Sequence, residues 1–366
     1  LKLLDWNLNE LMATSDPPLP PDGLLDARGI TRLADEVGPI LAYYSSSELL
    51  IGFLVLPGRE NPFVQVISYK RLELASLVDQ ARLALANPGQ PGKPGLLRQL
   101  WDGLIGPFLE ELPSHGPLTV IPHGPLHQLP FEVLTDASGK PMYERWLVTT
   151  APSASILAVC RQRHSPRSDR EPFWAMGDRN ALRFKPETQD IARLFDSRNP
   201  SEFNLADFER FRTQVPNQRH LLIATQGRLD EDNRSNTYLE IQPTQQHDPR
   251  LTAAEISSMS IPAELVALAA CDSNAAEPLQ SDERLDLTRA FLIAGAASVL
   301  ATRWKIQEDE STTRFLTDFY QAYRRGGPNR QGLRKDEALN VARRKSRERG
   351  DPAQVWAAWV LVGDPR

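Results

Sequence analysis

The chain has 366 residues, a formal net charge of −5, 41% hydrophobic residues and 24% charged residues. This balance is typical of a globular protein with enough core for one large domain or two smaller ones. The weak negative charge argues against nucleic acid or an anionic membrane as the main partner. The longest apolar runs, such as residues 49–56, are far shorter than the roughly 20 residues of a membrane span.

The cysteine content and the N-terminus bear on the compartment. Cys160 and Cys271 do not make a disulfide framework, so we expect a reducing cytoplasm. Cys160 follows the apolar run SASILAV and is expected to be a small buried core residue. The N-terminus lacks the features of a secretory signal. Because the first residue is Leu rather than Met, we expect a fragment or a processed product.

The first part of the chain predicts a linker followed by a small α+β portion. Residues 1–28 are expected to be a linker or the tail of a preceding region, because SDPPLPPDG is rich in proline. Residues 29–114 form the α+β portion. Its short apolar runs, separated by turn-forming residues, predict an antiparallel meander, and its amphipathic stretches predict helices. The strands are expected at 40–45, 49–56 and 63–68, and the helices at 72–87 and 96–112.

From Pro117 onward, short apolar runs alternate with amphipathic stretches. This pattern predicts an α/β fold over residues 115–366, with a mainly parallel sheet covered by helices on both faces. No internal repeat is visible. The strands are expected at 117–122, 146–152, 172–178, 220–227, 264–271 and 297–304, and the helices at 153–163, 186–196, 284–294 and 308–325.

Two of these strands end in loops with chemically informative residues. HLLIATQG ends at Gln226 and Gly227, and ELVALAAC ends at Cys271. Ligands of such sheets bind beyond the carboxyl ends of the strands, and neighbouring strands lie only about 4.8 Å apart. A cysteine nucleophile needs a nearby base or cation to ionise, and a glycine lets backbone N–H groups approach an oxyanion. The two loops therefore indicate the layout of a cysteine peptidase.

Three stretches of the chain resemble one family, the CHAT domains, which are relatives of caspases and separases and are often attached to tetratricopeptide repeats. Their order and spacing match over about residues 29–366. The resemblance implies a caspase-like three-layer α/β/α fold and a Cys–His dyad. It assigns Cys271 to the nucleophile position, Gln226 to the general-base position and Gly227 to the oxyanion hole. The matching stretches are 118–134 with 141–157, 220–227 with 251–256, and 265–274 with 287–312 and 356–365.

The chain departs from the family in both catalytic loops. The family's first loop reads Ala-Thr-His-Gly, whereas this chain has Gln226 before Gly227. Glutamine cannot take up a proton at neutral pH, and loss of a positioned base typically costs on the order of 10²–10⁴ in rate. The family's cysteine loop usually continues with glycines, but residues 273–286 contain none. We therefore expect peptidase activity to be absent or severely impaired, whether Gln226 is natural or a deliberate inactivating change.

Another histidine could in principle replace the missing base. His247, in a polar turn near residues 251–256, is the best of these candidates. His220 shares a strand face with Gln226 but lies six residues back, roughly 20 Å away. The remaining histidines lie in loops or linkers and are expected to be structural: His115, His123, His127 and His164.

Candidate substrate contacts follow the same two loops and the next strand. Asp272 either shapes a pocket for a basic side chain or makes capping and loop hydrogen bonds. Trp304 either lines a substrate cleft or packs in the core, and Asp309 lies in the same loop. The basic stretch 324–350 is expected to be the solvated face of a helix rather than a nucleic-acid contact.

These observations leave two function classes open. In the first, the domain is a pseudopeptidase that acts as a protein-binding or regulatory module, with a possible helical-repeat region preceding this chain. In the second, it is an active cysteine endopeptidase that cleaves a protein partner through Cys271, or an engineered inactive form of one. A nucleotide-binding protein is disfavoured, because residues 89–93 lack the spacer and the hydroxyl residue of a phosphate loop. No cofactor and no metal are expected.

Overall fold

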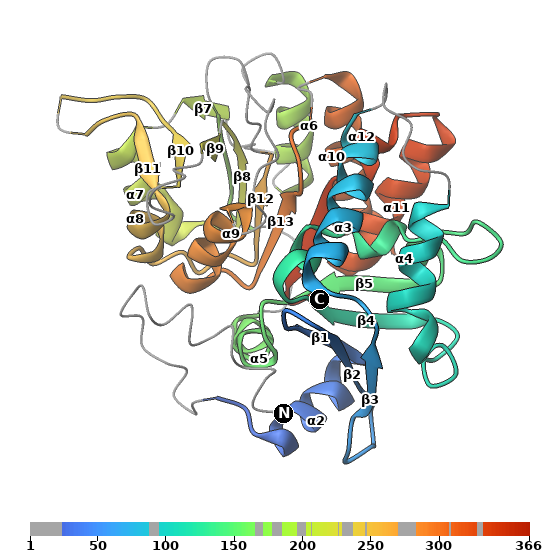
Figure 1. The fold of residues 1–366 in the computed structure, drawn as a ribbon. Helices are drawn as coiled ribbons and strands as arrows, with labels where there is room; N and C mark the ends of the chain where they lie inside the picture. Colours follow the sequence, from blue (N-terminus) through green and yellow to red (C-terminus); the bar gives the residue numbers. More distant parts are fainter. Residues whose placement is uncertain are drawn as a thin grey trace. The chain divides into compact units, whose positions relative to one another are not determined.

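The computed structural model describes twelve stretches of the chain, which fall into two compact units, Leu1–Val159 and Cys160–Arg366 (Figure 1). Each unit has its own portion of β-sheet and its own helices. The boundary expected between residues 114 and 115 stays a prediction. The described residues are 24–87, 95–164, 171–177, 185–195, 203–205, 207–225, 227–228, 237–245, 247–269, 283–306, 309–327 and 332–366.

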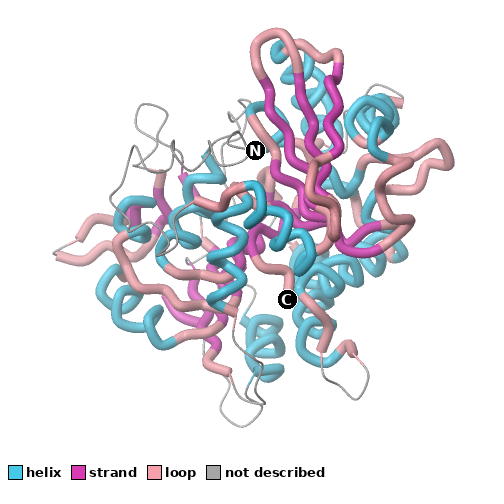
Figure 2. The backbone as a smooth tube through the Cα atoms, turned by 90° about the horizontal axis from the view of Figure 1, so that it is seen from below, coloured by secondary structure: helices cyan, strands magenta, loops and turns pink. Residues whose placement is uncertain are grey.

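The first unit carries five strands in the order β3-β2-β1-β4-β5. The pairs β1–β2 and β2–β3 are antiparallel, which confirms the expected meander, and β1–β4 and β4–β5 are parallel. The three meander strands lie side by side in Figures 1 and 2. The bounds are β1 Ile40–Ser45, β2 Leu50–Val55, β3 Phe63–Ile67, β4 Gly116–Ile121 and β5 Trp146–Thr150.

Helices cover both faces of this first sheet portion. One buried cluster joins the sheet to α3 (Arg71–Ala86) and α4 (Leu96–Leu104), and a second joins it to α2 (Ala27–Val37) and the start of α5 (Ala154–Arg163). Short 3₁₀ turns follow at Gly106–Phe108, Gly124–Gln128, Phe131–Val133 and Met142–Glu144.

One expected helix is shorter than predicted. The stretch 96–112 reads as a single amphipathic helix, but α4 ends at Leu104 and a 3₁₀ turn begins at Gly106. Pro107 explains the difference, because it lacks the backbone N–H that an α-helix needs and disfavours helical geometry in the residue before it.

The second unit carries six strands of the main sheet in the order β14-β13-β12-β8-β6-β7. All neighbours are parallel except β13 and β14. Nearly every residue in the central strands is buried, as expected when helices cover both faces. The bounds are β6 Phe173–Gly177, β7 Phe203–Leu205, β8 His220–Ala224, β12 Leu265–Leu268, β13 Ser298–Thr302 and β14 Trp359–Gly363.

Aromatic contacts show that helices pack on opposite faces of this second portion. Phe173 contacts rings from α6 and α10, whereas the ring of the next residue, Trp174, contacts Phe211 of α7. Successive strand residues point to opposite faces, so the three-layer α/β/α arrangement is confirmed. The helices are α6 Lys185–Phe195, α7 Phe208–Gln214, α8 Ala253–Ser257, α9 Glu283–Ala294, α10 Glu310–Arg325, α11 Lys335–Glu348 and α12 Ala353–Trp356, with a 3₁₀ turn at Val215–Asn217.

Two further features were not expected from the sequence. A small antiparallel sheet has the order β11-β10-β9, formed by Gly227–Arg228, Tyr238–Glu240 and Arg250–Thr252. The basic stretch 324–350 is also not wholly solvated, because Lys335 and Arg343 are buried. Among the described residues, no helix is long and apolar enough to cross a membrane.

Candidate functional site

The candidate site lies where β8 and β12 end. The two strands are adjacent and parallel, with Leu265 level with His220 and Leu268 level with Ile223. Their carboxyl ends therefore open at the same edge of the sheet, where ligands of α/β proteins bind. Gln226, Cys271 and Asp272 lie outside the described residues, so the predicted approach of Gln226 to Cys271 stays a prediction.

The backbone on either side of position 226 is well anchored. Thr225 is buried, and its hydroxyl donates a hydrogen bond to the carbonyl oxygen of Glu240 in β10. Gly227 begins β9 and pairs with Leu239 of β10. The small sheet thus holds the chain after β8 at Thr225 and again at Gly227.

His247 is held by both of its ring nitrogens. Nδ1 donates to the carbonyl oxygen of Asp248 at 2.7 Å, and Nε2 donates to Oε1 of Glu255 at 2.9 Å. Its ring stacks on Phe208 with the ring centres 3.9 Å apart. Because both acceptors take hydrogen bonds from the ring, the arrangement favours the imidazolium form. Burial works against the positive charge, but the bonds to Glu255 and Asp248 raise the pKa of His247. A ring engaged in this way is poorly suited to act as a free base.

His220 occupies the opposite end of β8 from Gln226. It is fully buried, and its Nε2 donates to Oε2 of Glu171 at 2.6 Å. Arg324 of α10 donates to the same carboxylate oxygen at 2.7 Å. Burial lowers the pKa of His220 even though Glu171 favours its charged form. These contacts make His220 part of a buried structural cluster at the amino end of the strand.

Two other predicted residues take structural positions. Trp304 is 3% exposed, and its indole N–H donates to the carbonyl oxygen of Gln354 at 2.9 Å. Asp309 caps α10 by accepting a hydrogen bond from the backbone N–H of Thr312 at 3.0 Å. These contacts correspond to packing and capping, and a substrate contact by Trp304 stays a proposal. In the first unit, His123 accepts a hydrogen bond from the backbone N–H of Ser45.

Cys160 is buried, as expected, and burial raises the pKa of its thiol to about 12. The thiolate is the reactive form of cysteine. Cys160 is therefore an inert core residue rather than a second nucleophile.

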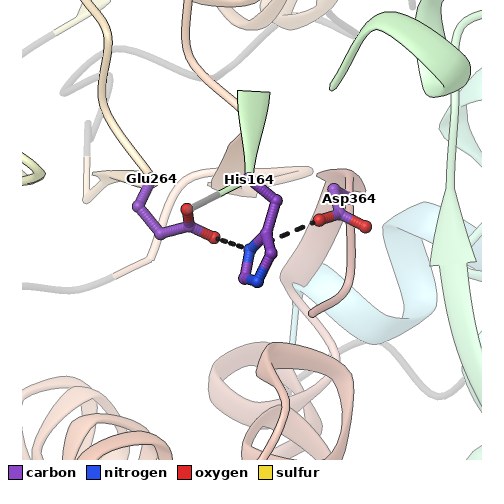
Figure 3. A group of neighbouring side chains, drawn as sticks. All are labelled: His164, Glu264 and Asp364. Atoms are coloured by element: carbon purple, nitrogen blue, oxygen red, sulfur yellow. Dashed lines mark hydrogen bonds and ion pairs between the residues drawn. The ribbon is translucent and has the colours of Figure 1, made fainter. Parts of the chain in front are cut away.

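A cluster that sequence reasoning missed joins His164, Glu264 and Asp364, whose ligand-type atoms lie within 4.8 Å of one another (Figure 3). His164 donates from Nδ1 to Oε1 of Glu264 at 2.8 Å. Glu264 precedes β12, at the opposite end of that strand from Cys271. His164 lies 100 residues before Glu264 and Asp364 lies 100 residues after it, which explains why no local pattern in the sequence reveals the cluster.

The cations that contact this cluster show whether its carboxylates are paired or are open to bind a metal ion. The ammonium of Lys335, which is fully buried, lies 2.5 Å from Oε1 of Glu264. Burial works against ionisation of Glu264, but Lys335 and His164 lower its pKa to about 2. Arg161 and Arg366 contact the carboxylate of Asp364. Protein cations thus balance both carboxylates, so the cluster is an ion-pair network rather than a set of open metal ligands.

Comparison with known proteins gives a family match, one curated relative and two similar solved structures. The model of the CHAT domain family matches residues 94–364. A human protein, tetratricopeptide repeat protein 28, is 32% identical over 113 residues, covering 31% of this chain and 4% of the relative. The separase–securin complex of Saccharomyces cerevisiae aligns with a TM-score of 0.59 at 13% identity, covering 93% of this chain and 31% of that one. The Arg-specific cysteine proteinase gingipain R aligns with a TM-score of 0.47 at 10% identity, covering 80% and 74%.

The chain therefore spans a small part of the curated relative and about a third of the separase chain. The separase alignment extends over almost the whole chain and supports the caspase-like fold. The family match spans well over half of the 366 residues and includes both strands of the candidate site. The chain belongs to the CHAT domain family.

Proposed function

We propose that this CHAT domain is a peptidase-derived protein-binding module in which Gln226, in the general-base position, abolishes or severely impairs hydrolysis. The register between β8 and β12 carries the proposal. It joins residues 45 positions apart, as in Leu265 and His220, and Cys271 follows Gln226 by the same 45 positions. Because β8 and β12 end at the same edge of the sheet, we expect the loops that follow them to bring Gln226 and Cys271 together.

Glutamine at position 226 removes the general base but does not prevent the site from binding a peptide. Its amide can donate and accept hydrogen bonds, but it cannot remove a proton from a thiol at neutral pH. A site of this kind still offers backbone N–H groups near Gly227 to a peptide carbonyl. We therefore expect it to bind a protein segment without cutting it efficiently.

The partner we propose is a protein. The yeast separase structure with the same fold is a complex with securin. The human relative is named as a tetratricopeptide repeat protein. By analogy, we propose that a helical-repeat region precedes this domain in the full-length protein and helps to select its partner.

Thiol reactivity provides the first test. Without a base, Cys271 should titrate near the ordinary thiol value of about 8.5, or higher if it is buried. Its alkylation by iodoacetamide should therefore rise steeply only in alkaline buffer. Peptide mass spectrometry separates Cys271 from the buried Cys160, which should stay unmodified and serves as an internal control. Rapid modification of Cys271 at about pH 6 would mean that another cation activates it.

Restoring the base provides the second test. Gln226→His should give weak or no hydrolysis of a mixed peptide library, because a base without correct orientation contributes little, and the loop after Cys271 also lacks the family's glycines. Gln226→His combined with Cys271→Ala is the matched control for contaminating proteases. Robust turnover that depends on Cys271 would contradict the proposed decay of both loops.

An active endopeptidase is the second candidate. The anchoring of Thr225 and Gly227 by β10 favours it, since an oxyanion-hole loop needs such support. Turnover by the unaltered chain that disappears in Cys271→Ala would establish this candidate in place of the first.

A further inference from the structure

The outer strand of the first unit's sheet portion carries exposed apolar side chains. β3 is the end strand of the main sheet, and in the part of the chain that the structure describes β2 is the only strand that pairs with it. Within β3, Val64 is 47% exposed and Val66 is 67% exposed. The outer edge of such a strand presents backbone N–H and C=O groups with which another strand can pair.

β3 has none of the features that usually prevent a further strand from pairing with an edge. Native edge strands are commonly protected by a lysine, a proline or a bulge within the strand. The five residues of β3 include no charged residue, and the nearest proline, Pro62, precedes the strand. The register with β2 runs from Phe63 to Ile67 without a bulge. β3 is therefore suited to accept another strand at its outer edge.

The sequence of β3 fits a second copy of itself. It reads Phe-Val-Gln-Val-Ile, which is nearly symmetric about Gln65. In an antiparallel pair with a two-fold axis at Gln65, Val64 lies opposite Val66 of the second copy. Phe63 lies opposite Ile67 of the second copy, and the two Gln65 amides, which can both donate and accept hydrogen bonds, lie opposite each other. Opposite residues share a face of the sheet, so valine meets valine, and an aromatic ring meets a β-branched side chain.

Neighbouring positions of the axis fit less well. The axis must pass through a residue, because both copies have to present the same face of the sheet on the same side. An axis at Val66 would place Gln65 opposite Ile67, a polar side chain against an apolar one. An axis at Val64 would place Val66 opposite Pro62, which has no N–H for a ladder hydrogen bond. The sequence therefore favours the axis at Gln65.

The charged residues beside β3 support the same pairing. Glu60 lies three residues before the strand and Lys70 three residues after it, and both are exposed. The start of one strand lies beside the end of the other in an antiparallel pair, so each Glu60 is at the same end as Lys70 of the second copy. Lys70 lies 3.7 Å from Glu48 of its own copy, so Glu60 would be a second acidic neighbour. Arg59, in the same turn as Glu60, is already bound to Glu111.

We propose that two copies of this chain pair through β3, as an antiparallel extension of the sheet with its two-fold axis at Gln65. A dimer of this symmetry uses the same surface of both copies, as most protein dimers do. Two strands of five residues bury less than the roughly 1,200–2,000 Å² of a stable interface. The dimer should therefore be weak and reversible, with a Kd between about 1 µM and 1 mM.

A cysteine at the axis tests the register. Opposite residues of an antiparallel pair have Cα atoms about 4.5–5.5 Å apart, which is within disulfide reach. Gln65→Cys, in a Cys271→Ala chain whose remaining native thiol, Cys160, is buried, should therefore form a disulfide-linked dimer under mild oxidation. Val66→Cys in the same background is the matched control. It lies diagonally from its counterpart, about 7–8 Å away, and should cross-link at least about tenfold less.

Sedimentation velocity on the whole chain, from about 1 µM to about 500 µM, measures the pairing itself. Val66→Lys places a charge on the valine face and should raise the Kd of the dimer at least about tenfold. Leu24→Lys adds the same charge at a residue that is 44% exposed and lies outside the strand, and it should leave the Kd unchanged. Glu60→Lys and Lys70→Glu should each weaken the dimer, whereas the two changes combined in one chain should restore it.

The outcomes separate pairing through β3 from other contacts. The absence of self-association over this concentration range would overturn the proposal, and so would a dimer that survives Val66→Lys. Equal cross-linking of Gln65→Cys and Val66→Cys, or a double charge reversal that fails to restore the dimer, would overturn the axis at Gln65. Val66 is exposed, so Val66→Lys should keep the melting temperature of the unaltered chain, which confirms that the loss of pairing is not a loss of folding.

Discussion

The buried pair of Lys335 and Glu264 allows a quantitative prediction. The Lys335 ammonium donates to Oε1 of Glu264 at 2.5 Å and to the backbone carbonyl oxygen of Asp364 at 3.1 Å. Lys335→Met removes the charge but keeps most of the side-chain volume. Glu264 then stays buried with His164 and Arg219 as its remaining partners. Removing one member of a buried ion pair typically lowers the free energy of unfolding by about 3–5 kcal/mol. Because His164 and Arg219 still contact Glu264, we expect a loss near the lower end of this range for Lys335→Met.

The pKa of Glu264 gives a second value for the free energy that its ion pairs contribute to folding. Its value of about 2 lies below the ordinary value of 4.5. At about 1.4 kcal/mol for each pH unit, the shift corresponds to about 3 kcal/mol of folding free energy. Because the folded-state pKa is lowered, this contribution is fully present above pH 4.5 and is lost as the pH falls towards 2. Lys335→Met should therefore also weaken the pH dependence of stability in that window.

The assay must show that the loss of stability occurs in the second unit, which contains Lys335 and Glu264. Urea unfolding followed by hydrogen exchange of peptides from β12 and β14 reports on the unit that contains the pair. Lys345→Met is the matched control in the same helix, because its ammonium pairs with Asp318 at 2.8 Å but is half exposed. Such surface pairs contribute about 0–1 kcal/mol. If the two variants lose the same stability, the reasoning from burial is wrong.

Two further predictions concern His247 and Gly363. The raised pKa of His247 means that its hydrogen bond to Glu255 contributes stability below the ordinary histidine value of 6.5, and that this contribution is lost as the pH rises through the folded-state pKa. An NMR titration should show this pKa above 6.5, and Glu255→Gln should lower it. Gly363 has φ +102°, and an added Cβ would lie 2.5 Å from a backbone oxygen, so Gly363→Ala should destabilise the chain by more than about 2 kcal/mol. Gly139→Ala, at φ +78° with open space around it, should cost only about 1–2 kcal/mol in the same thermal unfolding assay.

Most of the fold could be predicted from apolar patterning. The central strands of a parallel sheet are buried on both faces, so they form short continuous apolar runs that stand out in the sequence. β8 and β12 illustrate this, because each consists almost wholly of buried residues. By contrast, β9, β10 and β11 have two or three residues each. Their pairing depends on tertiary contacts, so no local periodicity in the sequence predicts these three strands.

A site could be predicted from the sequence only where its informative residues follow a recognisable strand. One apolar run followed by Gln-Gly and another followed by Cys indicate a candidate site through their sequence alone. The network of His164, Glu264 and Lys335 could not be found in this way, because its members are distant in the sequence. Lys335 also lies in a strongly basic stretch, where an exposed side chain is the ordinary expectation. Its burial depends on the carboxylate that β12 brings to it.

The amino ends of β8 and β12 hold structural ionic contacts, whereas the candidate catalytic loops follow their carboxyl ends. The described ionic contacts that fix β8 and β12 lie at their amino ends, where His220 pairs with Glu171 and Glu264 pairs with Lys335. The candidate catalytic loops follow the carboxyl ends of the same strands. A change from His to Gln at position 226 leaves those amino-end contacts intact. The domain can therefore lose peptidase chemistry while it keeps its fold, which is the condition for a peptidase scaffold to persist as a binding module.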